Sequence, residues 1–356
     1  MALYTVATEA LMSEKPTVLL APYFRTLNEI FDPSDLERLA SFSDIVWGRD
    51  EPLPENEFDT FLPDVWAYVS TRHAPFSGGM NADRLARAPK LRALIEVSGG
   101  FASGIDYAEC FKRGIRVLSC APAFGPQVAE MALGMAIAGG RGLVAEHEAF
   151  RQGNEVWQSD PPGRDFTLYG KDVGFIGFGS LARNLLPLLQ PFGVCVRAFD
   201  PWLPDTAIAK LGCIPASLEE VLSESRVVFV LAVPTPTNRG LFSREKLCLL
   251  QRNALLLLIS RSHLVDFDAL TELLEKGCFQ AAIDVFPDEP HFPADHPIRK
   301  VPGVILSAHR AASIRLERRA IGKMVVDDLE LMARGLPPTQ LQVAEPELIQ
   351  LRGKAS

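Results

Sequence analysis

The chain has 356 residues, enough for two domains, and its 47% hydrophobic and 22% charged residues are typical of a globular protein. With 36 basic and 44 acidic side chains the net charge is −8, which argues against a general nucleic-acid binder and against an anionic membrane surface as partner. The apolar runs are too short to span a bilayer, and the N-terminus lacks the pattern of a signal peptide. Six cysteines without CxxC spacing indicate buried thiols in a reducing compartment, so we expect a cytoplasmic protein without a metal site.

The first 120 residues alternate apolar runs with helical patterns. Strands are expected at 17–21, 45–47, 65–69, 94–97 and 115–119. Helices are expected after Pro33, at 82–88 and at 107–113, whereas the acidic, proline-rich segment 50–61 is expected to be a loop. This alternation predicts a small doubly wound α/β domain.

Residues 128–143 form an apolar stretch with few charges. A helix that is apolar on most sides needs cover from more than one partner, so we expect this one to be buried and to support a homodimer. Residues 152–169 show no periodicity and predict a loop.

The second half of the chain predicts another α/β sheet. Its strands are expected at 173–176, 194–199, 227–233, 254–260, 281–285 and 304–307. Six is the usual number of strands in a complete dinucleotide-binding sheet. A long amphipathic helix is expected at 313–334, followed by a tail that packs elsewhere.

A strand, a glycine turn, a helix and a second strand follow one another between residues 172 and 200, as a dinucleotide-binding fingerprint requires. Gly177 permits the tight turn, and Gly179 lets the backbone approach a pyrophosphate at the helix N-terminus. Asp200 ends the second strand, where a carboxylate can accept hydrogen bonds from both ribose hydroxyls and would repel a 2′-phosphate. We therefore expect NAD rather than NADP, with a glycine turn that binds no ligand as the alternative. The expected cofactor contacts here are Gly177, Gly179, Ser180, Leu181, Ala182 and Asp200.

Three kinds of reactive side chain follow later strands of the same predicted sheet. Arg261 follows the strand at 254–260, Asp284 and Glu289 follow the next, and His309 follows the last. Each alone is more often a solvated or structural residue. Ligands of open α/β sheets bind beyond the carboxyl ends of the strands, so the set together indicates a reaction site.

The order and local sequence of these segments resemble those of the D-isomer-specific 2-hydroxyacid dehydrogenases, such as phosphoglycerate dehydrogenases and glyoxylate/hydroxypyruvate reductases. The resemblance is carried by an arginine followed by Val-Asp in 260–266, by Asp-Val-Phe-Pro-Asp-Glu-Pro in 284–290, and by the histidine segment 308–311. The chain departs from the family at Ser262, Ala308, Val233 and Phe101, where a glycine, two prolines and a glycine are usual, and Arg310 is also unusual. No catalytic group is lost, but the identity of the substrate stays open.

The resemblance implies a small 2-oxo acid, or its D-2-hydroxy acid, as substrate. Arg261 would bind the carboxylate with its planar guanidinium fork, and His309 would exchange a proton with the substrate oxygen. Glu289 would pair with the imidazole and fix its orientation. The substrate carboxylate would also contact Gly99, Gly100 and Phe101, and Arg72, next to His73, could recognise a phosphate or a second carboxylate unless it is simply solvated.

Further cofactor contacts are implied at Ala232, Val233, Ser260, Arg261, Asp284 and His309, with Asp284 on the nicotinamide amide or ribose. The resemblance implies two doubly wound parallel-sheet domains: a Rossmann NAD-binding domain, residues 125–312, inserted in a flavodoxin-like substrate domain, residues 1–124 completed by 313–356. A corepressor-like NAD-binding regulator with little turnover remains the alternative. Formate or phosphite oxidation is disfavoured, because the formate enzymes of this superfamily pair their histidine with glutamine.

Overall fold

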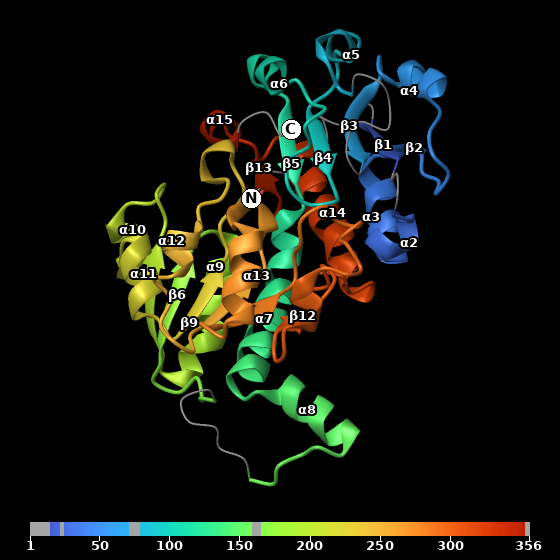
Figure 1. The fold of residues 1–356 in the computed structure, drawn as a ribbon. Helices are drawn as coiled ribbons and strands as arrows, with labels where there is room; N and C mark the ends of the chain where they lie inside the picture. Colours follow the sequence, from blue (N-terminus) through green and yellow to red (C-terminus); the bar gives the residue numbers. More distant parts are fainter. Residues whose placement is uncertain (1–14, 22–24, 71–78, 159–164, 353–356) are drawn as a thin grey trace. The chain divides into compact units, whose positions relative to one another are not determined.

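The computed structural model describes residues 15–21, 25–70, 79–158 and 165–352. The chain divides into two compact units, a first unit of Met1–Phe124 with Ile314–Ser356 and a second unit of Gly125–Ser313. The first unit therefore takes residues from both halves of the chain, and its ribbon contains both blue and red segments in Figure 1.

The first unit is built on one mixed sheet. Its strands are β1 (Thr17–Ala21), β2 (Asp44–Trp47), β3 (Val65–Ser70), β4 (Ala93–Glu96), β5 (Arg116–Ser119) and β13 (Gln342–Val343). The order is β13-β5-β4-β3-β1-β2, in which β1 to β5 pair in parallel and follow the 2-1-3-4-5 order of flavodoxin-like domains. The doubly wound sheet is confirmed, but β13, which pairs antiparallel to β5, was not foreseen.

Helices cover both faces of this sheet. They are α2 (Leu27–Ile30), α3 (Pro33–Phe42), α4 (Glu55–Phe61), α5 (Ala82–Ala86), α6 (Tyr107–Arg113), α14 (Arg319–Ala333) and α15 (Pro346–Arg352). Leu39 of α3 and Val325 of α14 join the core on one face, and Phe58 of α4 and Cys110 of α6 join the core on the other. The expectation of a loop at 50–61 was wrong for α4, because Pro54 lies just before the helix and the buried Phe58 anchors it.

The C-terminal part of the first unit is fixed by α14. The helix begins at Arg319 rather than at 313, after the short 3-10 turn Leu316–Arg318. Asp328 in this helix is fully buried, and its carboxylate accepts backbone hydrogen bonds from Thr339 (2.7 Å) and Leu341 (2.7 Å). These bonds hold the segment that leads into β13.

The second unit contains a sheet in which every pairing is parallel. Its strands are β6 (Asp172–Ile176), β7 (Cys195–Phe199), β8 (Ile214–Pro215), β9 (Val227–Val230), β10 (Leu255–Leu258), β11 (Gln280–Ile283) and β12 (Ile305–Leu306). The order β12-β11-β10-β9-β6-β7-β8 is that of a Rossmann sheet with β12 added at one edge. The Rossmann fold is confirmed; the expected six strands omitted β8, whose two residues are too few to show periodicity.

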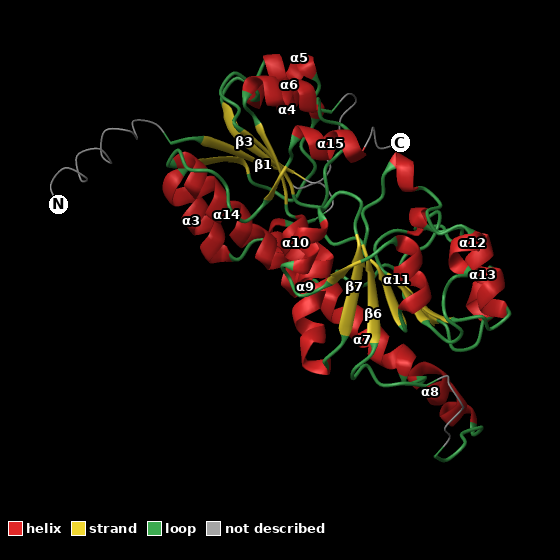
Figure 2. Cartoon of the chain, turned by 90° about the vertical axis from the view of Figure 1, so that its left-hand side faces the viewer, coloured by secondary structure: helices red, strands yellow, loops and turns green. Residues whose placement is uncertain are grey.

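Helices also cover both faces of the second sheet (Figure 2). They are α7 (Gly125–Gly140), α8 (Leu143–Gln152), α9 (Ser180–Leu189), α10 (Asp205–Ala209), α11 (Leu218–Glu224), α12 (Arg244–Leu247) and α13 (Phe267–Glu275). The helices α7 and α9 pack on one face of the sheet, and α11, α12 and α13 pack on the other.

The helix predicted at 128–143 is α7, which ends at Gly140, and the next helix, α8, was not predicted. Much of α7 is buried against α9 and the sheet, whereas α8 buries none of its residues and projects from the second unit in Figure 1. Gly142, with a positive φ of 59°, separates the two helices. Among the described residues no single helix has the length and apolarity to cross a membrane; Ala121–Gly140 with Leu143–Gln152 meets these two criteria only as a pair bent by 60°.

Candidate active site

The predicted glycine turn joins β6 to α9. Gly177 has φ 92°, and a Cβ on it would lie 2.5 Å from the Ala232 Cα, so only glycine fits. Gly179 is exposed, and no heavy atom lies within 4 Å of where its Cβ would be. Ala182 is fully buried, as close packing of helix and strand requires. Exposed Gly179 and Ser180 leave open space at the N-terminus of α9, which suits a pyrophosphate.

Asp200 lies directly after β7 and beside this turn. One carboxylate oxygen accepts a hydrogen bond from the Phe178 amide (2.8 Å) and the other from the Trp202 amide (2.9 Å). Each oxygen keeps a second lone pair, because a carboxylate can accept about four hydrogen bonds. The carboxylate is therefore oriented before any ligand arrives. Leu181 is half-buried in the first turn of α9.

The loops after β9 and β10 bring further predicted residues to the same edge of the sheet. Ala232 lies against Gly177, since its Cα occupies the space that a Cβ on Gly177 would need. Val233 is 36% exposed. Ser260 is 6% exposed, and within the described ranges its hydroxyl has no hydrogen-bond partner. Arg261 is exposed, with one guanidinium nitrogen donating to the Ser260 carbonyl at 2.7 Å.

Asp284 holds the loop that carries His309. Its carboxylate accepts hydrogen bonds from the Ser307 hydroxyl, the Arg310 amide (2.7 Å) and the Ala311 amide (3.0 Å), and its carbonyl accepts from the His309 amide (2.7 Å). The side chain has no exposed surface. The carboxylate is thus occupied by the loop that carries His309, and the expected contact of Asp284 with the cofactor stays a prediction.

His309 and Glu289 form the central pair of the site. Their Nδ1 and Oε2 atoms lie 2.6 Å apart, and the other Glu289 oxygen accepts from the Phe286 amide at 2.6 Å. The side chains are 47% and 30% exposed. A carboxylate can only accept, so Nδ1 carries the proton of this bond. The second imidazole nitrogen, Nε2, is left for exchange with a ligand.

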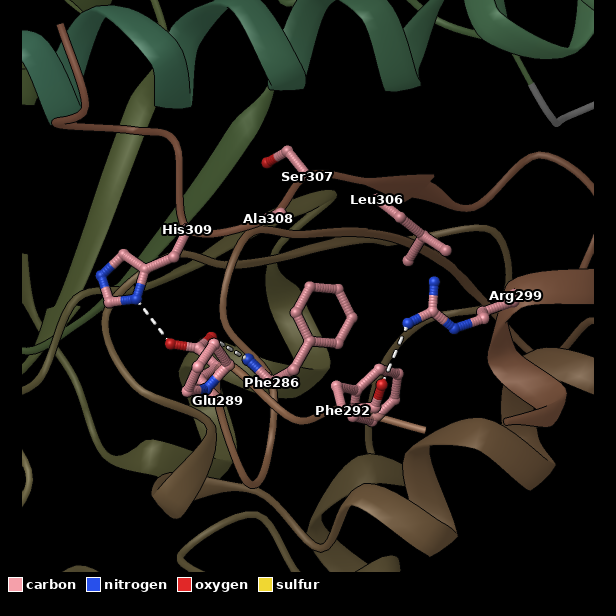
Figure 3. A pocket seen from close by; sticks show the side chains of 9 residues that line it. Phe286, Glu289, Phe292, Arg299, Leu306, Ser307, Ala308 and His309 are labelled. Atoms are coloured by element: carbon pink, nitrogen blue, oxygen red, sulfur yellow. Dashed lines mark hydrogen bonds and ion pairs between the residues drawn. The ribbon is translucent and has the colours of Figure 1, made fainter. Parts of the chain in front are cut away.

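A pocket of about 500 Å³ adjoins this pair. It is lined by Phe286, Glu289, Pro290, Phe292, Arg299, Leu306, Ser307, Ala308 and His309. In Figure 3 the Nε2 atom of His309 faces away from Phe286 and Arg299. The pocket thus lies on the side of His309 that faces Phe286 and Arg299. A ligand bound at Nε2 would lie on the opposite side of the imidazole.

Considered by itself, the first unit carries other predicted residues after β4. Gly99 and Gly100 have φ values of 93° and 80°, and Phe101 is half-buried. Arg25, which the sequence did not single out, donates to the Val97 carbonyl at 3.0 Å beside this turn, and burial lowers the pKa of its guanidinium. Arg72 and His73 lie outside the described residues.

The cysteines form no disulfide and show no metal-binding arrangement among the described residues. All six cysteines are free, and burial raises the pKa of both Cys110 and Cys120 to about 12. Within the ranges that the structure describes, no three His, Cys, Asp or Glu side chains are grouped so that they could hold a metal ion.

Comparison with known proteins gives one family. Residues 133–311, half of the chain, match the model of the D-isomer specific 2-hydroxyacid dehydrogenase NAD-binding domain. The structure of a phosphoglycerate oxidoreductase from Rhizobium etli is 36% identical and superposes with a TM-score of 0.82, covering 94% of this chain and 100% of that one.

Curated relatives agree with this match. A glyoxylate reductase from Aeropyrum pernix is 28% identical over 91% of this chain and 96% of its own length. A D-3-phosphoglycerate dehydrogenase from Methanocaldococcus jannaschii is 28% identical over 71% of this chain, which spans about half (48%) of that longer protein. The protein therefore belongs to the D-isomer specific 2-hydroxyacid dehydrogenases, a family of NAD-dependent oxidoreductases.

Proposed function

We propose that this protein transfers a hydride between NAD(H) and a small D-2-hydroxy acid or the corresponding 2-oxo acid. The observation that carries the proposal is the 2.6 Å pair of His309 and Glu289 at the carboxyl edge of an NAD-binding sheet. A histidine placed there can exchange a proton near neutral pH, which an alcohol–ketone interconversion requires.

The pair divides the work between two side chains. Glu289 is held by the Phe286 amide and accepts from Nδ1, so it fixes the imidazole plane and tautomer. Nε2 of His309 then donates a proton to the substrate oxygen during reduction and takes it back during oxidation. NAD(H), when bound, would supply the hydride chemistry at the substrate C2 atom.

Arg261 is proposed to bind the substrate carboxylate. It is exposed, follows β10 and is tethered to the Ser260 carbonyl. A planar guanidinium gives a carboxylate two parallel hydrogen bonds and orients it. The first unit is proposed as the substrate domain, where the Gly99, Gly100 and Phe101 backbone would also bind the carboxylate; the role of Arg72 in binding a phosphate remains a prediction.

NAD is proposed to bind to the glycine turn and to the loops that follow the neighbouring strands of the second sheet. The contacts would be Gly177, Gly179, Ser180, Leu181, Ala182, Asp200, Ala232, Val233, Ser260, Arg261, Asp284 and His309. The preoriented Asp200 carboxylate would accept from the ribose hydroxyls and repel a 2′-phosphate, so NADH should be preferred over NADPH.

The relatives point to a substrate class, and exposed apolar side chains point to an assembly. The relatives named as a phosphoglycerate oxidoreductase and a glyoxylate reductase favour a short 2-oxo acid. A homodimer is supported by α8 and the segment after it, where Leu143, Phe150, Val156 and Trp157 are 59–78% exposed. Six free cysteines favour the cytoplasm as the compartment.

The test is NADH consumption by the purified protein with glyoxylate, hydroxypyruvate, pyruvate, 3-phosphohydroxypyruvate and phenylpyruvate, each repeated with NADPH. Turnover of one acid with NADH preferred would support the proposal. NADH binding without turnover of any of them would instead favour a regulator of the same fold.

A further inference from the structure

Two loops that follow adjacent strands of the second unit are joined through one histidine. The Nε2 atom of His263, in the loop after β10, lies 2.9 Å from the carbonyl oxygen of Thr235, in the loop after β9. The His263 carbonyl accepts a second hydrogen bond from the Gly240 amide at 3.0 Å. One residue thus holds the first loop at two points five residues apart.

The loop after β9 transmits this attachment because it is closed on itself. Asn238 accepts from the Thr235 amide at 2.7 Å and donates to the Val233 carbonyl at 2.8 Å. Thr235 is only 3% exposed. A movement of the Thr235 carbonyl therefore shifts Val233, the residue of this loop proposed to contact the cofactor.

The loop after β10 is equally constrained. His263 lies in the 3-10 turn Ser262–Leu264, and Arg261 is the N-cap residue directly before this turn. The turn ends at the fully buried Leu264, whose carbonyl accepts from the Phe242 amide at 2.9 Å. Arg261 is itself exposed, so its backbone position depends on the attachment of the turn that follows it.

We propose that His263 is a positioning residue that fixes the Arg261 loop against the Val233 loop. The link would keep the carboxylate-binding guanidinium and the cofactor-binding backbone in one geometry. This inference rests on the function proposed above, in which Arg261 binds substrate and Val233 binds NAD. His263 itself would touch neither.

The hydrogen-bond chemistry separates this histidine from His309. The Thr235 carbonyl can only accept, so the Nε2 atom of His263 must be the protonated nitrogen. Its proton is engaged by the protein, whereas the Nε2 atom of His309 is the one left for exchange. Glutamine can replace His263 in this task, because its amide nitrogen lies the same number of bonds from the backbone and can donate.

The test compares His263→Leu, which keeps bulk but cannot donate, with His263→Gln, which can. In His263→Leu we expect the NADH Kd and the KM for the 2-oxo acid to rise about fivefold each, the effect of one ordinary hydrogen bond, with kcat changed less than about twofold. His263→Gln should stay within about twofold of the natural protein in all three. Glu275→Ala, an exposed change on α13, is the control for an unrelated substitution.

Equal losses in both variants, or natural values in His263→Leu, would overturn the proposal. If the leucine variant does not fold, His263→Ala takes its place against the glutamine variant. If the natural protein turns over no 2-oxo acid, the proposed function fails, while the NADH Kd values of the same variants still decide whether the link positions the cofactor loop.

Discussion

Asp284 in the second unit and Asp328 in the first are both fully buried, and each holds a chain segment through its carboxylate. Asp284 follows β11 and collects residues 307–311, including the loop of His309. Asp328 lies within α14 and collects residues 339–341, which lead into β13. The same arrangement therefore holds the loop of a proposed catalytic histidine in one unit and the segment before an edge strand in the other, so a buried carboxylate alone does not mark a site.

The largest effect should come from the residue that Asp284 positions. We expect His309→Asn to lower kcat by about 100- to 10,000-fold while NADH still binds, because the group proposed to exchange the proton is lost. Asparagine is chosen because His309 has a positive φ of 49°, which asparagine tolerates. Steady-state kinetics and an NADH titration measure the two quantities, and a loss of less than tenfold would contradict the acid–base role.

Asp284→Asn should damage both folding and catalysis. The new amide cannot accept at both positions, so at least one of the Arg310 and Ala311 amides loses its partner. We expect the free energy of unfolding to fall by about 2 kcal/mol and kcat/KM to fall at least about tenfold. Urea unfolding and kinetics on one preparation test this; unchanged kcat/KM would mean that the loop is held by other contacts.

Asp328→Asn is the matched change in the first unit. It should lower the free energy of unfolding by a similar amount, about 2 kcal/mol, because the Thr339, Gln340 and Leu341 amides share the same carboxylate. At temperatures where the protein stays folded, kcat/KM should remain within about twofold of the natural value. Faster thiol labelling of the buried Cys110 and Cys120 would show that the first unit is destabilised. A loss of kcat/KM as large as that of Asp284→Asn would contradict the difference expected between the two aspartates.

An exposed carboxylate should show the smallest effect. Hydrogen bonds from Lys276 and Arg244 lower the pKa of Glu272 from 4.5 to about 2. Its stabilising effect is therefore present above about pH 4.5 and is lost as the pH falls toward about 2. Glu272→Gln should reduce the acid dependence of the urea midpoint in this range, by less at high salt, because exposed ion pairs are screened. An identical acid dependence of the urea midpoint in both proteins would show that Glu272 does not interact with Lys276 and Arg244 in solution.

The elements that could be predicted from sequence are those whose signal is local. The glycine turn, the Rossmann strands and the positions of Arg261, Glu289 and His309 after strands all follow from nearby residues. The helix start at Pro33 was also found, since Pro33 followed by Ser34 and Asp35 fits the first turn of a helix.

What was missed depends on tertiary structure. The enclosure of Asp284 is set by residues 307–311, and the link from His263 to Thr235 spans 28 positions, so neither leaves a local pattern. The helix α8 was not predicted, because a helix that buries none of its residues carries no apolar face in its sequence. The strands β8 and β13 are two residues long and exist only through their neighbours.

The return of the chain into the first unit has a consequence for synthesis on the ribosome. The strand β13 completes the first sheet, and α14 packs on α2 and α3, where a Cβ on Gly322 would lie 2.4 Å from the Ile30 carbonyl oxygen. Residues 17–119 therefore emerge roughly ten to forty seconds before their last partners, at usual elongation rates. During this interval the second unit can fold first, while the core under β1 to β5 lacks its cover, so nascent chains should depend on chaperones until the C-terminal segment is released.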